Sequence, residues 1–234
     1  DETLVENIIP IQNLFREMYF QFSDQLGAEN QDSFFTALRL HAGELWGTMF
    51  DRPVTPEQQM LDCFEKSVLA SNSHSSQQAR ELAEQMFHRF TALSTSNVRF
   101  NAGATETLAA LKDAGFTTGI ITNGIEQLQL GKIHTLGLDQ QVDHVIVSAQ
   151  ARAHKPHLKV FNLALDQAGV EAEQAWQVGD NAINDVAGAI RAGMGGVFYD
   201  PTKEQLHKAF SDLRETPTHV IHDLPEVVEL ALAG

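Results

Sequence analysis

A single cysteine, Cys63, occurs among the 234 residues, so the chain cannot form an internal disulfide bond. The sequence also lacks a signal-peptide pattern and any run of about 18 apolar residues, the length that a transmembrane helix requires. We therefore expect a soluble, cytoplasmic protein. Cys63 falls in a helical pattern and is expected to be a small, buried apolar side chain.

Basic residues are scarce, with 16 Lys and Arg against 31 Asp and Glu, which gives a formal net charge of -15. Proteins that bind nucleic acids or anionic membranes need clustered Lys and Arg, so we expect neither kind of partner. No long block of like charge is present, and a hydrophobic content of 43% is enough to bury a core. We expect a folded monomer or homodimer whose acidity serves solubility.

The chain changes character near residue 95. Before that point the pattern is helical: "IQNLFREMYFQFSDQLG" has apolar residues at helical spacing and is closed by Gly27. Thr55 is expected to cap a second helix whose first residue is Pro56. The amphipathic run "SSQQARELAEQMFHRFTAL" predicts a further helix, and no strand is predicted in this block.

Beyond residue 95, short apolar runs alternate with helical patterns. The predicted strands are 116–122, 144–148, 175–180 and 195–200, and the predicted helices are 104–114, 126–136, 156–168, 182–192 and 202–211. A last run, 218–222, is expected to form an edge strand before a terminal helix that starts at Pro225.

This alternation predicts an α/β fold, a Rossmann-like parallel sheet with helices on both faces, together with an all-helical domain. The expected domains are the start of the core at 1–7, the helical domain at 8–95 and the α/β core at 96–234. Ligands of such sheets usually bind at the carboxyl ends of the strands.

Polar side chains stand at two of those strand ends. Thr122 offers a hydroxyl, and Asn123 and Gly124 offer backbone N–H groups that could bind an anion, although the same residues could simply cap the next helix. Lys155 precedes Pro156, so its ammonium could reach the strand ends, although a lysine is more often solvated surface. His154 and His157 flank this lysine, but two histidines without further ligands do not make a zinc site.

The segment "VGDNAIND" places two carboxylates at a strand end. Asp180 follows the strand directly, and Asp185 comes five residues later, near the start of a helix. Oxygen ligands of this kind suit Mg²⁺, although a carboxylate is also favoured at a helix N-terminus for structural reasons. A threonine, a lysine and paired carboxylates at one sheet edge indicate a phosphoryl-transfer site that still needs a nucleophile.

The first residues, "DETL", supply a further part of the expected site. They have the form of a strand end that turns outward, with Asp1 and Thr3 projecting into the site. A preceding strand that carries a second aspartate is expected to stand before Asp1, because removing a central strand would expose unpaired backbone groups.

These segments together resemble the haloacid dehalogenase-like hydrolase superfamily, in particular its phosphatases with a helical C1 cap. Asp1-Glu2-Thr3 matches the last three positions of the motif Asp-x-Asp-x-Thr, and Thr122 matches the second motif. Lys155 matches the third motif, and "GDNAIND" matches the fourth. The order and spacing agree across essentially the whole chain, except that the nucleophilic aspartate would stand two residues before Asp1.

The resemblance implies a role for each matched residue. The aspartate before Asp1 would form an aspartyl-phosphate, and Asp1 would act as acid and base and ligate Mg²⁺ through its carbonyl. Thr122 and the Asn123 amide would hold phosphoryl oxygens, with Lys155 neutralising charge. Asp180 would bind Mg²⁺ directly, and Asp185 would orient the ion directly or through water.

The implied function is Mg²⁺-dependent hydrolysis of a small phosphorylated metabolite, with the helical domain as a cap over the site. Asp1 and Asp180 favour a phosphatase over a haloacid dehalogenase, because the dehalogenase motifs lack both. A phosphomutase on the same scaffold and a non-catalytic binding protein remain alternatives. A phosphonate hydrolase is disfavoured, since Lys66, which lies inside a predicted helix, is the only lysine between residues 8 and 95.

Overall fold

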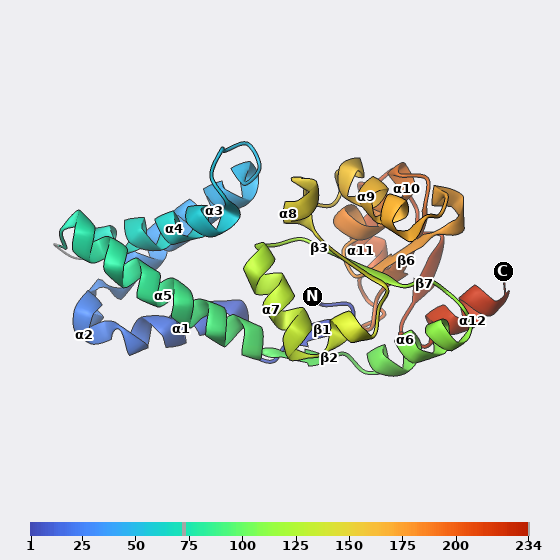
Figure 1. The fold of residues 1–234 in the computed structure, drawn as a ribbon, viewed down its shortest axis with the longest axis horizontal. Helices are drawn as coiled ribbons and strands as arrows, with labels where there is room; N and C mark the ends of the chain where they lie inside the picture. Colours follow the sequence, from blue (N-terminus) through green and yellow to red (C-terminus); the bar gives the residue numbers. More distant parts are fainter. Residues whose placement is uncertain (72–73, 234) are drawn as a thin grey trace. The chain divides into compact units, whose positions relative to one another are not determined.

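The computed structural model describes residues 1–71 and 74–233, which form two compact units (Figure 1). The α/β unit comprises Asp1–Asn7, Val98–Gly124 and the chain from Ile133 onward. The helical unit comprises Ile8–Asn97 and Ile125–Lys132, and the predicted division at 8–95 did not include this second segment. No helix in the described part of the chain has both the length and the apolar character needed to cross a membrane.

The helical unit follows the predicted pattern with one interruption. Its elements are α1 (Ile11–Gln21), α2 (Ser23–Leu26), η1 (Ala28–Asn30), α3 (Gln31–Thr48), α4 (Pro56–Ser71), α5 (Ser76–Ser96) and the start of α7 (Glu126–Thr135). The predicted first helix breaks at Phe22, whose φ of -109° is not helical. The expected start of α4 is confirmed, because Thr55 Oγ1 accepts the N–H of Gln58 at 3.2 Å.

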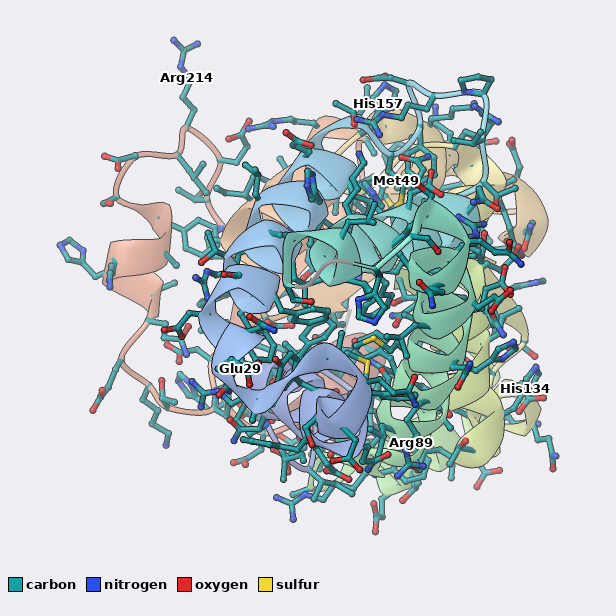
Figure 2. All side chains as sticks on the ribbon, turned by 90° about the vertical axis from the view of Figure 1, so that its left-hand side faces the viewer. Glu29, Met49, Arg89, His134, His157 and Arg214 are labelled. Atoms are coloured by element: carbon teal, nitrogen blue, oxygen red, sulfur yellow. The ribbon has the colours of Figure 1, made fainter. Side chains whose placement is uncertain are left out.

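Aromatic side chains from several helices form the core of this unit. Phe15 of α1 stacks on Phe90 of α5 with ring centroids 4.4 Å apart, and Phe64 of α4 lies 5.9 Å from Phe90. At the surface, Arg89 of α5, labelled in Figure 2, donates a hydrogen bond to Gln21 at the end of α1. Cys63 is buried as expected, and burial raises the pKa of its thiol to about 11.

The α/β unit contains two parallel sheets and one antiparallel ribbon. The strands β3 (Gly119–Thr122) and β4 (His144–Val147) are parallel, as are β5 (Trp176–Gly179), β6 (Gly195–Tyr199) and β7 (His219–Ile221) in a second sheet. These findings confirm the predicted parallel α/β class, with β7 at the expected edge. The ribbon of β1 (Val5–Asn7) and β2 (Val98–Phe100) was not predicted.

Helices cover both faces of the strands. They are α6 (Ala104–Asp113), the end of α7, η2 (Leu138–Gln140), α8 (Ser148–Ala151), α9 (Leu158–Ala168), η3 (Ala172–Gln174), the π-type helix η4 (Ala182–Ala187), α10 (Gly188–Arg191), α11 (Leu206–Phe210) and α12 (Glu226–Ala233). One face of β6 packs with α6 and α12, around Val197 and Ile221. Helices α9 and α10 pack against β4 in a separate cluster around Ile146 and Phe161 (Figure 1).

Two predicted helices begin later than expected because side chains bond to the backbone near their starts. The helix predicted from Pro156 begins at Leu158, since the His157 ring accepts the N–H of Lys159 at 3.1 Å. The helix predicted at 202–211 shortens to α11, because the Asp200 carboxylate accepts the backbone N–H groups of Gln205 and Leu206 and holds the preceding turn.

The predicted helix 182–192 divides into η4 and α10. At its start, Asn181 Oδ1 accepts the N–H groups of Ile183 and Asn184, at 3.1 and 2.8 Å. The Asn181 side chain therefore caps the π-type helix η4, and this helix contains Asp185.

Candidate active site

Lys155 links the two parallel sheets at the carboxyl ends of their strands. Its Nζ donates to the carbonyl oxygen of Ile121 in β3 at 2.7 Å and to Asp185 Oδ1 beyond β5 at 2.5 Å. Only 11% of the Lys155 side chain is exposed. The alternative of a solvated surface lysine is therefore wrong, and one fixed positive charge stands beside the end of β3.

Asp185 is the buried partner of this lysine. Its side chain is 6% exposed, and its second oxygen, Oδ2, accepts the N–H of Asn181 at 3.0 Å. Gly179 leaves room for the carboxylate, since a Cβ at that position would overlap Asp185. Removing either charge of a buried pair leaves the other uncompensated, which typically costs about 3–5 kcal/mol.

Asp180 is joined to the first residues of the chain. Thr3 Oγ1 donates to Asp180 Oδ1 at 2.7 Å, and Asn101 Nδ2 donates to the carbonyl oxygen of Thr3 at 2.6 Å. The structure thus brings Thr3 to the end of β5, as the sequence predicted. Asp1 is exposed, two residues before Thr3.

The loop after β3 carries the other predicted residues. Thr122 is 7% exposed at the end of the strand. The Asn123 side chain bonds to the backbone of Lys155 on both sides, as acceptor at 2.8 Å and donor at 3.0 Å, rather than capping the next helix. The N–H of Gly124 donates to Ser148 Oγ at 3.1 Å, so this predicted anion donor is already engaged.

The two histidines beside Lys155 point to separate partners. His157 caps α9, whereas His154 Nδ1 lies 2.9 Å from Ser148 Oγ. Burial lowers the pKa of His154 from its ordinary value. Among residues 1–71 and 74–233, no group of three or more His, Cys, Asp and Glu could hold a metal ion.

The oxygen donors at the end of β5 nevertheless fit Mg²⁺. That ion usually takes one or two protein carboxylates and completes its shell with water and substrate phosphate, so a protein cluster of three ligands is not required. Among the described residues, Thr3 bonds to Oδ1 of Asp180, and Oδ2 is an oxygen that could hold a cation. Both oxygens of Asp185 have protein partners, which favours an indirect role for that residue.

Two residues of the site were missed in the sequence. Ser148 directly follows β4, and Asn101 directly follows β2. Ser148 could have been found by the rule that located Thr122 and Asp180, because it is the polar last residue of a predicted parallel strand. Asn101 carried no such signal, since β2 was not predicted.

Comparison with known proteins gives matches in sequence and in fold. A profile described as haloacid dehalogenase-like hydrolase matches residues 49–198. The chain is 38% identical over 128 residues to a glyceraldehyde 3-phosphate phosphatase of Pyrococcus furiosus, covering 55% of this chain and 52% of that protein. It is 34% identical over 127 residues to a ribulose-1,5-bisphosphate 5-phosphatase of Halopiger xanaduensis, covering 54% and 53%. These matches span about half the length of the curated relatives.

A solved structure matches the whole chain. The 2-haloacid dehalogenase from Pseudomonas syringae pv. Tomato superposes with a TM-score of 0.79 at 24% identity, covering 100% of this chain and 95% of that one. At this level of identity the likeness concerns the fold alone. It is consistent with parallel strands that carry the candidate residues at their carboxyl ends.

Proposed function

The chain belongs to the haloacid dehalogenase-like hydrolase family, and from this premise we propose that the protein is a Mg²⁺-dependent phosphatase of small phosphomonoesters. The observation that carries the proposal is the setting of Lys155, whose buried ammonium lies between β3 and Asp185. Thr122 is the last residue of β3, and Asp180 directly follows β5. A fixed positive charge, a hydroxyl and carboxylates at the strand ends suit phosphoryl transfer.

The proposed reaction proceeds in two displacements. The aspartate predicted two residues before Asp1 by the Asp-x-Asp-x-Thr pattern attacks phosphorus, and the bond from phosphorus to the alcohol oxygen breaks as Asp1 protonates that oxygen. Asp1 then takes a proton from water, whose oxygen attacks the phosphorus of the aspartyl-phosphate. The products are the alcohol and inorganic phosphate, and the aspartate is restored.

The residues that hold the phosphoryl group are proposed from their positions. The Thr122 hydroxyl and the N–H of Asn123 bind its oxygens, and Lys155 offsets the negative charge. Asp180 and the carbonyl oxygen of Asp1 would hold Mg²⁺, with Asp185 acting through water. When bound, the ion neutralises charge that develops on the phosphoryl oxygens.

The relatives and the helical unit support a proposal for the substrate class. The two relatives described above are named for glyceraldehyde 3-phosphate and ribulose-1,5-bisphosphate, both small phosphorylated metabolites. We propose a substrate of this size in the cytoplasm, with the helical unit as the cap that selects it.

The test is a phosphate-release screen with the full-length protein and Mg²⁺ over triose phosphates, sugar phosphates, nucleoside monophosphates and phosphoserine. We expect release with at least one substrate, and loss of release with EDTA or in Asp180→Ala. The matched control is Asp113→Ala, an exposed carboxylate at the end of α6, which should keep full activity. No release from the full-length protein with any substrate would overturn the proposal.

The same screen separates the alternatives. Halide release from 2-haloacids without phosphate release would identify a dehalogenase. Isomerisation of a phosphosugar without free phosphate would identify a phosphomutase. Binding of substrates with neither reaction would identify a non-catalytic binding protein.

A further inference from the structure

Hydrogen bonds join two loops of the α/β unit, and each loop takes part with two consecutive residues. Asn123 and Gly124 belong to the loop after β3, and His154 and Lys155 belong to the loop before α9. Asn123 bonds directly to Lys155, because its Oδ1 accepts the Lys155 N–H at 2.8 Å and its Nδ2 donates to the Lys155 carbonyl oxygen at 3.0 Å. A side-chain amide that bonds to both backbone groups of one residue fixes that residue in translation and rotation.

The second tie passes through Ser148. Its side chain is fully buried, and its Oγ accepts the N–H of Gly124 at 3.1 Å. The same oxygen lies 2.9 Å from His154 Nδ1 and 3.5 Å from the carbonyl oxygen of Gly124. Burial favours the neutral ring of His154. The neutral ring can bond to Ser148 Oγ through Nδ1 in either tautomer, as acceptor of the serine proton or as donor of a ring proton.

We propose that Asn123, Ser148 and His154 form a positioning clamp that holds the phosphate-binding loop in register with the Lys155 ammonium. The proposal rests on the proposed phosphatase function, and it assigns these side chains no contact with the reacting atoms. The clamp sets the distance between two groups that must reach one phosphoryl group, the backbone at Thr122–Asn123 and the lysine Nζ.

The ammonium itself is also anchored. Lys155 Nζ bonds to Ile121 and Asp185, so the clamp and this anchor hold the lysine from both ends, backbone and side-chain tip. Loss of the clamp frees the backbone end only. We expect a small displacement of the loop, and a displacement of about 1 Å can lower a rate on the order of 100-fold.

Steady-state kinetics of the full-length protein tests the clamp in Asn123→Ala and Ser148→Ala. We expect kcat to fall on the order of 10- to 100-fold, while KM changes much less, because positioning acts on the reacting geometry. Ser67→Ala is the matched control: Ser67 is an equally buried serine of the helical unit that donates to the Cys63 carbonyl oxygen at 2.6 Å. Variants of the clamp with the kinetics of this control would overturn the proposal.

Two variants of His154 separate positioning from general destabilisation. His154→Asn keeps an acceptor near the place of Nδ1, whereas His154→Gln carries its amide near the place of Nε2. We expect His154→Asn to retain most of the wild-type kcat and His154→Gln to lose as much as Ser148→Ala. Equal kcat in the two variants would show that the bond to Ser148 does not act as proposed.

Hydrogen exchange distinguishes failure of the clamp from failure of the proposed function. Backbone amides of residues 148–158 are expected to exchange faster in Asn123→Ala and Ser148→Ala than in wild type and Ser67→Ala. Unchanged exchange overturns the clamp whatever the activity. Faster exchange in a protein without phosphate release would support the clamp as a structural tie and overturn the phosphatase function instead.

Discussion

The helical unit and the α/β unit use their buried residues differently. The helical unit is filled by large apolar side chains such as Tyr19, Phe34 and Phe64, all fully buried. Both units bury polar side chains, but those of the helical unit include serines such as Ser67, which bonds to the backbone of its own helix. In the α/β unit, the buried polar groups at the strand ends include Ser148 and Asp185, which bond to residues of other segments. Apolar contacts are non-directional, whereas hydrogen bonds and ion pairs fix distances and angles, so the second unit carries the more exacting geometry.

The contrast extends to glycine. At Gly43, in the middle of α3, a Cβ would meet no heavy atom of the described residues within 4 Å apart from its own stretch of helix backbone. At Gly179 a Cβ would overlap Asp185, and at Gly196 it would lie 2.8 Å from Val186 Cγ1. The same substitution should therefore have opposite effects in the two units. Substitutions in the two units should therefore distinguish effects on stability from effects on the geometry of the candidate site.

The largest expected effect is on stability, in the helical unit. Phe64→Ala removes a fully buried ring whose centroid lies within 6.3 Å of the ring centroids of Phe15, Phe87 and Phe90. We expect the free energy of unfolding to fall by about 3–5 kcal/mol, measured by urea denaturation. Phe20→Ala, at a ring that is 60% exposed, is the control and should change stability by less than about 0.5 kcal/mol. Similar losses in both variants would contradict the assigned core.

Gly179→Ala should break the site rather than the fold. The added methyl group displaces the Asp185 carboxylate, and with it the partner of Lys155. We expect phosphate release to fall on the order of 100-fold. Overpacking should lower the free energy of unfolding by about 1–3 kcal/mol. Wild-type turnover in this variant would show that the position of Asp185 does not matter for the reaction.

Asp200→Asn tests a polar contact that lies outside the proposed chemistry. Burial alone would raise the pKa of Asp200, but hydrogen bonds from Thr202 and from the N–H groups of Gln205 and Leu206 outweigh it and lower the pKa below its ordinary value of 3.8. A lowered folded-state pKa stabilises the protein above the unfolded-state value, and that stability disappears as pH falls through the folded-state value.

We therefore expect Asp200→Asn to cost about 1 kcal/mol at pH 7, the usual size of a lost helix cap. The difference from wild type should shrink as pH falls below about 4, the ordinary pKa of an aspartate. Thermal unfolding at pH 7 and pH 3 measures both values. A difference that does not depend on pH would exclude the carboxylate charge as its source.

The smallest effect, and the one of opposite sign, is expected for Gly43→Ala. Alanine is favoured over glycine inside a helix, and this position has room for the methyl group. We expect the free energy of unfolding to rise by about 0.5–1 kcal/mol in thermal unfolding. A loss of stability would show that this face of α3 is covered in the native protein.

The order of strands and helices was predictable because it depends on local patterns. Short apolar runs mark β3, β4, β5 and β6, and polar residues at the end of β3 and soon after β5 mark the site. Thr122, Asp180 and Asp185 could therefore be named from the sequence. The settings of Lys155 and Asn123 could not, because each bond joins residues more than 25 positions apart.

Two features of the fold could not be predicted from the sequence, each for a physical reason. The ribbon strands β1 and β2 have three residues each and carry polar groups such as Glu6 and Arg99, which form an ion pair at 2.7 Å rather than an apolar pattern. The assignment of Ile125–Lys132 to the helical unit depends on contacts of Ile125 and Leu128 with a core built more than 30 residues earlier. No local pattern encodes such contacts.

The ribbon also has a use in protein engineering. Asn7 and Val98 are register partners at its far end, so the chain leaves for the long insertion and returns at directly opposed positions. An insertion exchanged for residues 8–97 can therefore keep the pairing of Val5 with Phe100, but it must also pack against Ile125–Lys132, the second segment of the helical unit. Grafting insertions from other proteins at this junction, with matching changes in Ile125–Lys132, would test whether the helical unit selects the substrate.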